Sequence, residues 1–441
     1  MEQTSKSPKL VASTSDTYCC SIADSRIREN KLQDVPSQEQ DAVPLPSMKD
    51  EELELNYFKN AQWSPDGTCL LTSSADNTIR TFILPPTLLE SPSPINLTPY
   101  TVHIHPTPIN CLTSYPLFSL SDPTTTLYLS TGIDLPIRLS NALSPIPTPI
   151  SSYPLISPTT EAYYTPSSLL WSSPSHFLAG TDCLIALFDI SRNGDGPVSR
   201  MPTIPSKRHK MKGGGVGMRG IVSALSMQPL PEDADAGMLA AGTWTRWVGL
   251  YDMGGMGGTV ATWSIGEAAD KDAGVGGTGV TQTAWSPCGR YLFVVERKSR
   301  GVLVYDVRVT GKLVCWLEGR GAETNQRLGV DVFGAEKGTE IWAGGTDGVV
   351  KVWEGVGMTE GAQERSWAWK AHDDPVTSAI LHSSGTVVAT CSGQRSSPSL
   401  TDDESDSKSD DEQESDSESH SSHSSRAPSR TPDNSIKVWR L

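Results

Sequence analysis

The sequence predicts an all-β fold, a seven-bladed β-propeller, and two observations carry that prediction. A strand-like motif recurs seven times along the 441 residues, and each copy follows signals for two further strands. Internal repeats of this kind are the signature of propellers and other repeat architectures. Between and beside the copies lie polar stretches with no apolar pattern to bury, which indicates disordered segments attached to the ring.

The repeated motif is a turn residue followed by alternating apolar residues and usually a closing aromatic, as in "DGVVKVW" and "DNSIKVW". Alternation of period two is typical of a half-buried strand entered through a tight turn. The seven copies occupy residues 76–82, 134–140, 182–188, 245–251, 299–305, 347–353 and 433–439. One copy departs from the pattern, because Ser140 stands where the aromatic is expected.

Hairpin signals precede the motif and complete the blade. "NAQWSPDG" at 60–67 and "TQTAWSPCG" at 281–289 each end in a Pro and Gly turn that leads into another apolar strand. Three strands of this kind plus a connecting fourth make one propeller blade. The combination is the WD40 pattern, here with long connecting loops.

The last blade is predicted to be split. Its first two strands are expected near 376–381 and 387–392, and its third at 435–439, on the far side of a Ser/Asp/Glu-rich insertion at 396–432. A long solvated loop adds little closure entropy, so the blade tolerates the insertion. We expect the outermost strand to come from 44–56, which would seal the ring. The predicted domains are a disordered acidic tail (1–43) and the propeller (44–441).

Charge and composition narrow the function. The net charge is −15, but residues 401–420 alone hold ten acids and one lysine, so the folded part is close to neutral. Eight scattered cysteines without a C-x-x-C pair favour a reduced intracellular compartment over a disulfide framework or a zinc site. No apolar run reaches the roughly 20 residues of a membrane span. We expect a soluble monomer.

No catalytic constellation, metal site or cofactor motif stands out, so we expect a protein that is not an enzyme. The pair His103 and His105 lacks acidic or thiol ligands nearby and is interpreted as loop or strand histidines. The glycine-rich run at 213–220 lacks the Lys-Ser/Thr that completes a phosphate loop. Within the insertion, an acid follows three residues after Ser407, Ser409 and Ser415, which makes these serines possible phosphosites. The insertion is either a solubilising loop or a switch that competes for the basic face described next.

Loop positions predict one basic face. In a WD40 blade, the loops before strand one and between strands two and three open on the same side of the ring. The predicted basic residues on that side are Lys207, Arg208, Lys210, Lys212, Arg219, Arg246, Arg297, Lys298, Arg300, Arg327 and Arg395. Asn325, Gln326 and Gln394 lie among them and suit hydrogen bonding to bases or ribose, so the face is predicted to bind RNA. The alternative is that exposed loops simply favour Lys and Arg, and the acidic stretch 266–274 lies on the same side.

Three stretches resemble the telomerase Cajal body proteins, a WD40 family, in a fungal-type form: "NYFKNAQWSPDGTCLLTSSADNTIRTFILP" at 56–85, "TNQRLGVDV" at 324–332 and "TVVATCSGQR" at 386–395. The resemblance implies a nuclear scaffold that binds small Cajal body RNAs and telomerase RNA and aids folding, assembly and localisation of their ribonucleoproteins. It also implies that Gln326, Arg327, Gln394 and Arg395 belong to the functional surface. Blades two and three are diverged, so the partner RNA can differ. The alternatives are a spliceosomal snRNP-associated factor and a WD40 adaptor for an acidic protein.

Overall fold

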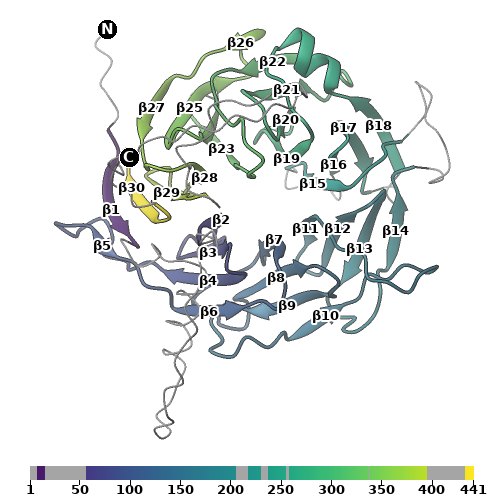
Figure 1. Ribbon diagram of the computed structural model, residues 1–441, viewed down its shortest axis with the longest axis horizontal. Coiled ribbons are helices and arrows are strands. Elements are labelled where there is room, and N and C mark those ends of the chain that lie inside the picture. The colour runs from purple at the N-terminus through teal and green to yellow at the C-terminus, as the bar shows by residue number, and fades with distance from the viewer. Residues whose placement is uncertain are drawn as a thin grey trace, which may run out of the picture.

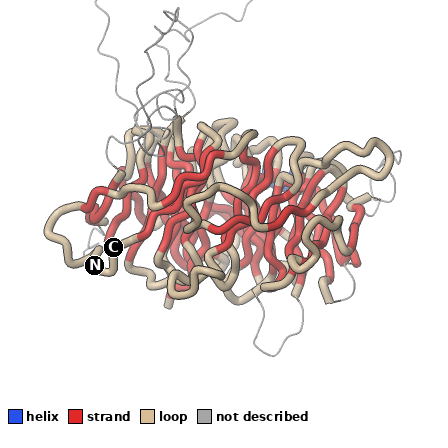
Figure 2. Tube along the Cα trace, turned by 90° about the horizontal axis from the view of Figure 1, so that it is seen from below, coloured by secondary structure: helices blue, strands red, loops and turns tan. Residues whose placement is uncertain are grey.

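The computed structural model describes residues 7–14, 56–204, 217–229, 237–254, 258–336, 338–394 and 433–441. These residues form seven antiparallel sheets arranged around a central axis, so the predicted seven-bladed propeller is confirmed (Figure 1). Seen from the side, the strands run between the two faces of a disc (Figure 2). The insertion at 396–432 and its three serines lie outside the described residues, as does most of the N-terminal tail.

Each blade has four main strands, and in blades 1 to 6 they follow one another in chain order from the axis outwards, whereas blade 7 takes its outermost main strand from the N-terminal segment (Figure 1). Blade 1 contains β2 (Phe58–Trp63), β3 (Cys69–Ser74), β4 (Thr78–Ile83) and β6 (Thr101–Ile104). Blade 2 contains β7 (Ile109–Ser114), β8 (Leu127–Gly132), β9 (Ile137–Asn141) and β10 (Ser151–Tyr153). Blade 3 contains β11 (Ser168–Ser173), β12 (His176–Thr181), β13 (Leu184–Asp189) and β14 (Ser199–Pro202).

The second half of the ring repeats the plan. Blade 4 contains β15 (Val222–Met227), β16 (Met238–Thr243), β17 (Trp247–Asp252) and β18 (Gly258–Ser264), followed by one π-helical turn, η2 (Ala268–Asp272). Blade 5 contains β19 (Val280–Trp285), β20 (Tyr291–Glu296), β21 (Val302–Asp306) and β22 (Leu313–Leu317). Blade 6 contains β23 (Val330–Ala335), β24 (Gly338–Gly344), β25 (Val349–Val356) and β27 (Trp367–Lys370). Blade 7 contains β28 (Val376–Leu381), β29 (Val387–Ser392), β30 (Ile436–Arg440) and β1 (Lys9–Ser13).

The strand that closes the ring differs from the prediction. β1 pairs antiparallel with β30, with Leu10 opposite Trp439 and Ser13 opposite Lys437. The closing strand therefore comes from residues 9–13 and not from 44–56, and the assignment of residues 1–43 to a disordered tail is wrong for this segment. The segment "KLVAS" is short, but it buries Val11 and Ala12 against blade 7. That burial, together with pairing to a completed sheet, makes up for its weak strand signal.

Two short strands tie neighbouring blades together. β5 (Ile95–Asn96) leaves blade 1 between β4 and β6 and pairs in parallel with β1 on the outside of blade 7. β26 (Gly361–Gln363) leaves blade 6 in the same way and pairs in parallel with β22 on blade 5. Each strand covers the open hydrogen-bonding edge of the preceding blade, which would otherwise be free to pair with another chain.

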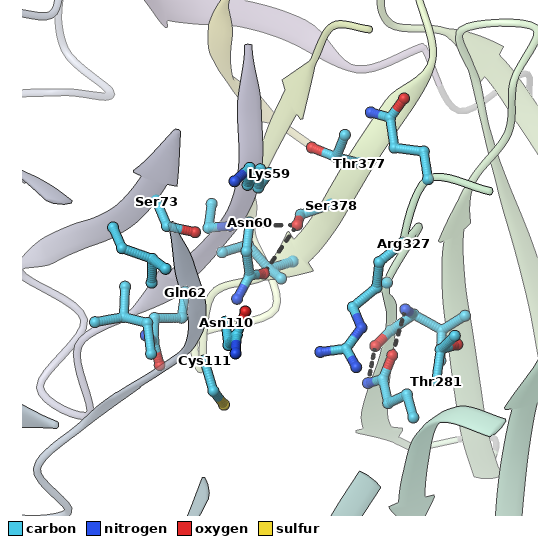
Figure 3. A pocket seen from close by; sticks show the side chains of 18 of the residues that line it. Lys59, Asn60, Gln62, Ser73, Asn110, Cys111, Thr281, Arg327, Thr377 and Ser378 are labelled. Atoms are coloured by element: carbon cyan, nitrogen blue, oxygen red, sulfur yellow. Dashed lines mark hydrogen bonds between the residues drawn. The ribbon is translucent and has the colours of Figure 1, made fainter. Parts of the chain in front are cut away.

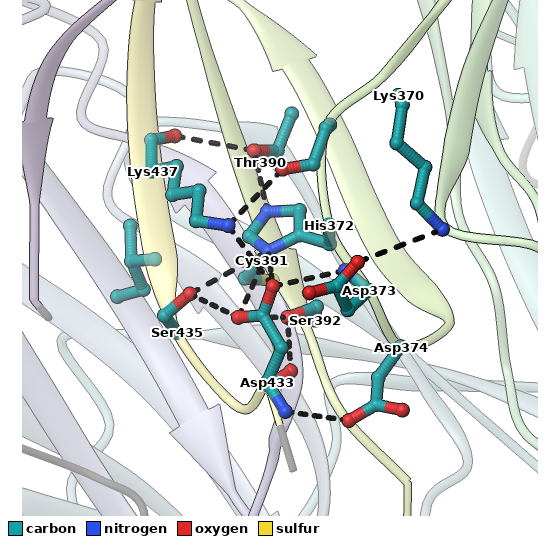
Figure 4. A network of polar contacts seen from close by, with 12 residues as sticks. Lys370, His372, Asp373, Asp374, Thr390, Cys391, Ser392, Asp433, Ser435 and Lys437 are labelled. Carbon is teal, nitrogen blue, oxygen red and sulfur yellow. Dashed lines mark hydrogen bonds and ion pairs between the residues drawn. The ribbon is translucent and has the colours of Figure 1, made fainter. Parts of the chain in front are cut away.

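Blade 7 holds a polar network that links β29 and β30 to the loops that carry His372 and Asp433 (Figure 4). The imidazole of His372 contacts the Thr390 hydroxyl at 2.8 Å through Nε2 and the Asp433 carboxylate at 3.3 Å through Nδ1. The indole of Trp439 donates to the same Thr390 hydroxyl at 2.9 Å. Asp433 also accepts from the Lys437 ammonium at 2.9 Å. Because these groups pair with one another across β29, β30 and the adjoining loops, they fix the register of β29 and β30 after the insertion.

Candidate nucleic-acid interface

The inner strands of the propeller surround a central cavity of about 670 Å³. Polar side chains from four of these strands line it, including Asn60, Asn110, Gln282 and Ser378. Figure 3 shows side chains from different blades pointing into one space. Its volume falls within the range of about 300–1,000 Å³ that is typical of ligand sites. The cavity is polar enough to receive part of a hydrogen-bonding partner.

The loop before β23 carries the predicted Asn325, Gln326 and Arg327 to this cavity. The Gln326 amide donates a hydrogen bond of 2.7 Å to the backbone carbonyl of Gly393, next to Gln394. The two stretches singled out in the sequence, 324–327 and 392–394, therefore touch one another. This contact agrees with the prediction that their loops open on the same side.

Arg327 extends from this loop into the cavity. Its guanidinium donates to the Ser223 carbonyl of β15 at 3.2 Å. In Figure 3 the side chain faces Asn110 and Cys111 on the opposite wall. Desolvation lowers the pKa of Arg327 from its usual value, which is far above neutrality, so the group stays a cation. A half-buried cation that is held by a neutral carbonyl keeps much of its attraction for an anion.

A second arginine supports the loop from below. Arg320 is almost fully buried, and its guanidinium donates to the carbonyls of Leu328 and Glu296. The Lys351 ammonium donates to the Arg320 carbonyl at 2.9 Å. Among the described residues no carboxylate pairs with Arg320, and burial lowers its pKa to about 10. It therefore places an additional positive charge under the loop that carries Arg327.

Arg297 and Trp244 meet at the edge of the cavity. Arg297 follows β20 and Trp244 follows β16, in equivalent loops of blades 5 and 4. The guanidinium carbon of Arg297 lies 5.2 Å from the centre of the Trp244 ring. The neighbouring Lys298 is exposed. We call Trp244, Arg297, Asn325, Gln326 and Arg327 the cavity mouth.

The side chains of Arg246 and Arg300 both form ion pairs with carboxylates of this chain, which leaves them less charge to offer to RNA. The Arg246 guanidinium forms ion pairs of 2.7 Å with both Glu296 and Asp270. The Asp270 partner comes from the acidic stretch 266–274 that was expected on this side. Arg300 pairs with Glu323 at 2.8 Å in an exposed position. Two carboxylates therefore already neutralise the Arg246 charge, and the predicted contact of Arg246 with RNA stays a prediction.

The remaining predicted residues are only partly placed. Arg219 is exposed, and its carbonyl accepts a hydrogen bond from the Thr245 hydroxyl beside Trp244. Gln394 is half-buried at the end of the described segment. Lys207, Arg208, Lys210, Lys212 and Arg395 lie outside the described residues, so their part of the basic face stays a prediction.

The inner wall of the cavity was missed by the sequence argument, which considered only loops. Polar residues recur along the innermost strands at Asn60, Gln62 and Asn110, where a buried strand would be apolar. Asp331 also lines the wall, and its carboxylate accepts from the backbone amides of Leu381 at 2.7 Å and Val332 at 3.0 Å. Burial raises its pKa to about 6. Polar residues within the first strand of each blade are the signal that would have located the wall.

The histidine pair has structural partners. His103 contacts the Tyr128 hydroxyl at 2.8 Å and the Ser144 carbonyl at 2.7 Å, and His105 contacts the Thr107 carbonyl at 2.8 Å. Within the part of the chain that the structure describes, no three His, Cys, Asp or Glu side chains gather as metal ligands would. No helix in that part has the length and apolar character needed to cross a membrane.

Comparison with known proteins agrees with the fold. Residues 59–82 match the family model of the WD domain, G-beta repeat. The chain is similar to Telomerase Cajal body protein 1 of Rattus norvegicus, with 29% identity over 79% of the chain and 60% of that protein. The human Telomerase Cajal body protein 1 is 28% identical over 79% of the chain and 59% of that protein. The chain thus spans about 60% of the length of these relatives.

A third relative carries a different name. Guanine nucleotide-binding protein negative regulator 1 of Schizosaccharomyces pombe is 29% identical over 69% of the chain and 72% of that protein. The predicted resemblance to telomerase Cajal body proteins and to WD40 proteins is confirmed by these matches.

Proposed function

We propose that this chain is a non-catalytic RNA-binding scaffold that holds a small nuclear or Cajal body RNA at the cavity mouth. The observation that carries the proposal is the hydrogen bond from Gln326 to Gly393, which joins two loops from different blades beside Arg327. The names of the mammalian relatives support a role with a Cajal body or telomerase ribonucleoprotein. On this proposal the chain aids folding, assembly and localisation of that particle and works in the nucleus as a monomer.

The chemistry of the mouth favours RNA in a single-stranded form. Arg297, Lys298 and Arg327 offer charge for phosphates, and Asn325 and Gln326 offer amides that match base edges and ribose hydroxyls. A double helix of RNA is recognised mainly by its shape across a wide groove, whereas loops expose their bases. A narrow polar mouth on a disc therefore suits a loop or an unpaired end.

The test of the proposal is recovery of RNA after cross-linking in cells, followed by sequencing of the bound species. Arg327→Ala combined with Arg395→Ala is expected to abolish recovery while the propeller stays folded. Arg192→Ala combined with Arg308→Ala is the matched control, because both arginines lie between the two outer strands of a blade, where the chain turns on the opposite side. Recovery that is unchanged in the first variant would overturn the site. The bound sequences also separate telomerase, small Cajal body and spliceosomal RNAs.

A protein adaptor is the second candidate, and the name of the Schizosaccharomyces pombe relative favours it, since that protein is named as a regulator of another protein. Salt dependence discriminates the two. RNA held through several phosphates loses orders of magnitude in affinity between about 50 and 200 mM salt, because counterions are released on binding. An acidic protein partner would survive nuclease treatment and show a weaker dependence on salt.

A further inference from the structure

A small cleft of about 170 Å³ opens beside the main cavity, between blades 4 and 5. Its lining consists of Trp244, Thr278, Gly279, Thr281, Arg297 and Asn325. The volume is below the range of about 300–1,000 Å³ for drug-sized ligands, so the cleft has room for a single ring system. Three of its six residues belong to the cavity mouth, which makes the cleft a side compartment of the proposed RNA site.

Trp244 is unusual among the tryptophans of this chain because 45% of its surface is exposed. Trp285, Trp342 and Trp353 are buried between blades, where they stabilise the fold. Trp244 instead presents its ring to the cleft with the Arg297 guanidinium 5.2 Å from its centre. An exposed indole beside a planar cation has no evident role in the core. It is a surface on which another flat ring can stack.

The loop that carries Trp244 is held firmly. The backbone amide of Trp244 donates to the Ile221 carbonyl at 3.1 Å. Gly279 packs against it with a φ of 152°, and a Cβ at that position would lie 2.6 Å from the Trp244 carbonyl oxygen. The ion pair of Arg246 with Glu296 then links the loop to the residue that precedes Arg297. Arg246 is thus a positioning residue, because it holds the indole and the guanidinium beside one another.

Asn325 supplies the polar group of the cleft. It is exposed, and among the described residues its side-chain amide has no protein hydrogen-bond partner. An amide offers one acceptor and two donors, which is the pattern that matches the edge of a nucleobase. The cleft therefore combines a stacking surface, a cation and an edge-reading amide within one small space.

We infer that this cleft is a base-binding subsite, in which one unpaired RNA base stacks on Trp244 against Arg297 while Asn325 contacts its edge. This inference rests on the proposed function and adds a specific contact to it. Stacking of a base on an aromatic ring tolerates every base, because each has a π face. The subsite therefore contributes affinity for unpaired RNA, and Asn325 contributes the preference among bases.

The test measures binding of a fluorescein-labelled single-stranded RNA of about twelve nucleotides, a length within the usual site sizes of such proteins. The full chain carries Trp244→Ala, Trp244→Phe or Arg327→Ala, and Tyr100→Ala is the control, since Tyr100 is an exposed aromatic outside both cavities. Trp244→Ala is expected to lose roughly tenfold or more in affinity, and Trp244→Phe much less. The slope of affinity against salt should stay unchanged in Trp244→Ala, because stacking releases no counterions, and should flatten in Arg327→Ala.

The outcomes separate the two proposals. Equal binding by Trp244→Ala and the unchanged chain, with loss of binding in Arg327→Ala, would overturn the subsite and leave the proposed function standing. Absence of RNA binding by the unchanged chain would overturn both. If Trp244→Ala binds RNA normally but loses a protein partner in nuclease-treated extract, the cleft holds a peptide side chain and the inference is wrong. Ultraviolet cross-linking of the labelled RNA should identify the peptide that contains Trp244, and an adduct only elsewhere would contradict the subsite.

Discussion

The buried network of blade 7 and the cavity mouth are both rich in polar groups, but they differ in how many of those groups have a hydrogen-bond partner in the protein. In blade 7 the side chains form a chain of hydrogen bonds, in which His372 contacts both Asp433 and Thr390, and Trp439 donates to Thr390. At the mouth, Arg297 stacks on Trp244, and among the described residues Asn325 has no polar partner. A network whose donors and acceptors are all used holds the fold together. A cluster with unused donors is prepared to bind something else.

Removal of the closing strand should have the largest effect. Deletion of residues 1–14 removes β1, exposes both the edge of β30 and the apolar side of blade 7, and leaves β5 without its partner. We expect a loss of about 5 kcal/mol or more in the free energy of unfolding, from lost apolar burial and strand hydrogen bonds. Urea unfolding measures the loss. Deletion of residues 1–6 alone is the control, and equal stability of the two truncated chains would show that β1 does not close the ring.

Arg246 and Arg327 allow the comparison to be tested within one region. Arg246→Ala leaves the Glu296 side chain, which is 1% exposed, without its charged partner. Breaking a buried pair in this way costs about 3–5 kcal/mol, so the unfolding free energy should fall clearly. Arg327→Ala removes a cation that bonds to a neutral carbonyl, so stability should change by about 1 kcal/mol or less while RNA affinity falls. Similar stability losses in both variants would contradict the division between structural and binding arginines.

Thr390→Val tests whether the blade 7 network serves only the fold. The substitution keeps the shape of the side chain but leaves the His372 and Trp439 nitrogens without their shared hydrogen-bond partner. Two unsatisfied buried groups should cost about 2–3 kcal/mol in thermal or urea unfolding. Thr124→Val, at an exposed turn, is the control with an expected change within about 0.5 kcal/mol. RNA affinity of the folded protein should be unchanged, and a loss there would connect the two regions.

The smallest expected effect is a dependence of stability on pH. Burial lowers the pKa of His372, His103 and His105 from the usual value. Below about pH 6.5 these imidazoles bind protons in the unfolded chain but stay neutral in the folded chain. The free energy of unfolding therefore decreases as the pH falls through that point. A raised carboxyl pKa acts in the opposite sense, and Asp331 therefore opposes this decrease below about pH 6. We expect the free energy of unfolding, measured with urea, to fall by roughly 1 kcal/mol between about pH 7 and pH 6.

The Asp331→Asn background sharpens this measurement, because it removes the opposing carboxyl group. Adding His372→Gln should then weaken the pH dependence, because only His103 and His105 still contribute, and should lower the stability at neutral pH. None of these titrating residues belongs to the cavity mouth, so RNA affinity should not follow the same curve. A pH dependence that is equally steep with and without His372→Gln would show that His372 does not contribute to it.

The repeat made the architecture predictable, because seven copies of one strand motif with hairpin turns leave few alternatives to a propeller. Loop geometry likewise predicted that residues 324–327 and 392–395 lie on the same side of the ring, since the order of strands in a blade decides the side on which each loop opens. The closing strand was not predictable in the same way. Five residues of "KLVAS" carry little strand signal alone, and they form a strand only because blade 7 offers a paired edge and an apolar surface.

The ion pairs of Arg246 could not be predicted from the sequence. The sequence shows an arginine in a loop and acids in 266–274, but it does not show that Asp270 and the buried Glu296 both reach the same guanidinium. The contact between Arg297 and Trp244 was not predicted from the sequence for a related reason. It depends on a contact between two loops about fifty residues apart, and on Gly279 leaving room for it.

The position of β1 in the sheet order has a consequence for how the chain folds during its synthesis. The backbone amide of Ile436 donates to the Thr14 hydroxyl across 422 residues of sequence. β1 therefore cannot pair until β30 has been synthesised. While the ribosome is still translating the intervening blades, the ring is open because blade 7 is incomplete. Contacts between such distant segments form slowly, and exposed edges invite wrong partners meanwhile. Cellular folding helpers are thus expected to matter until translation has passed residue 440.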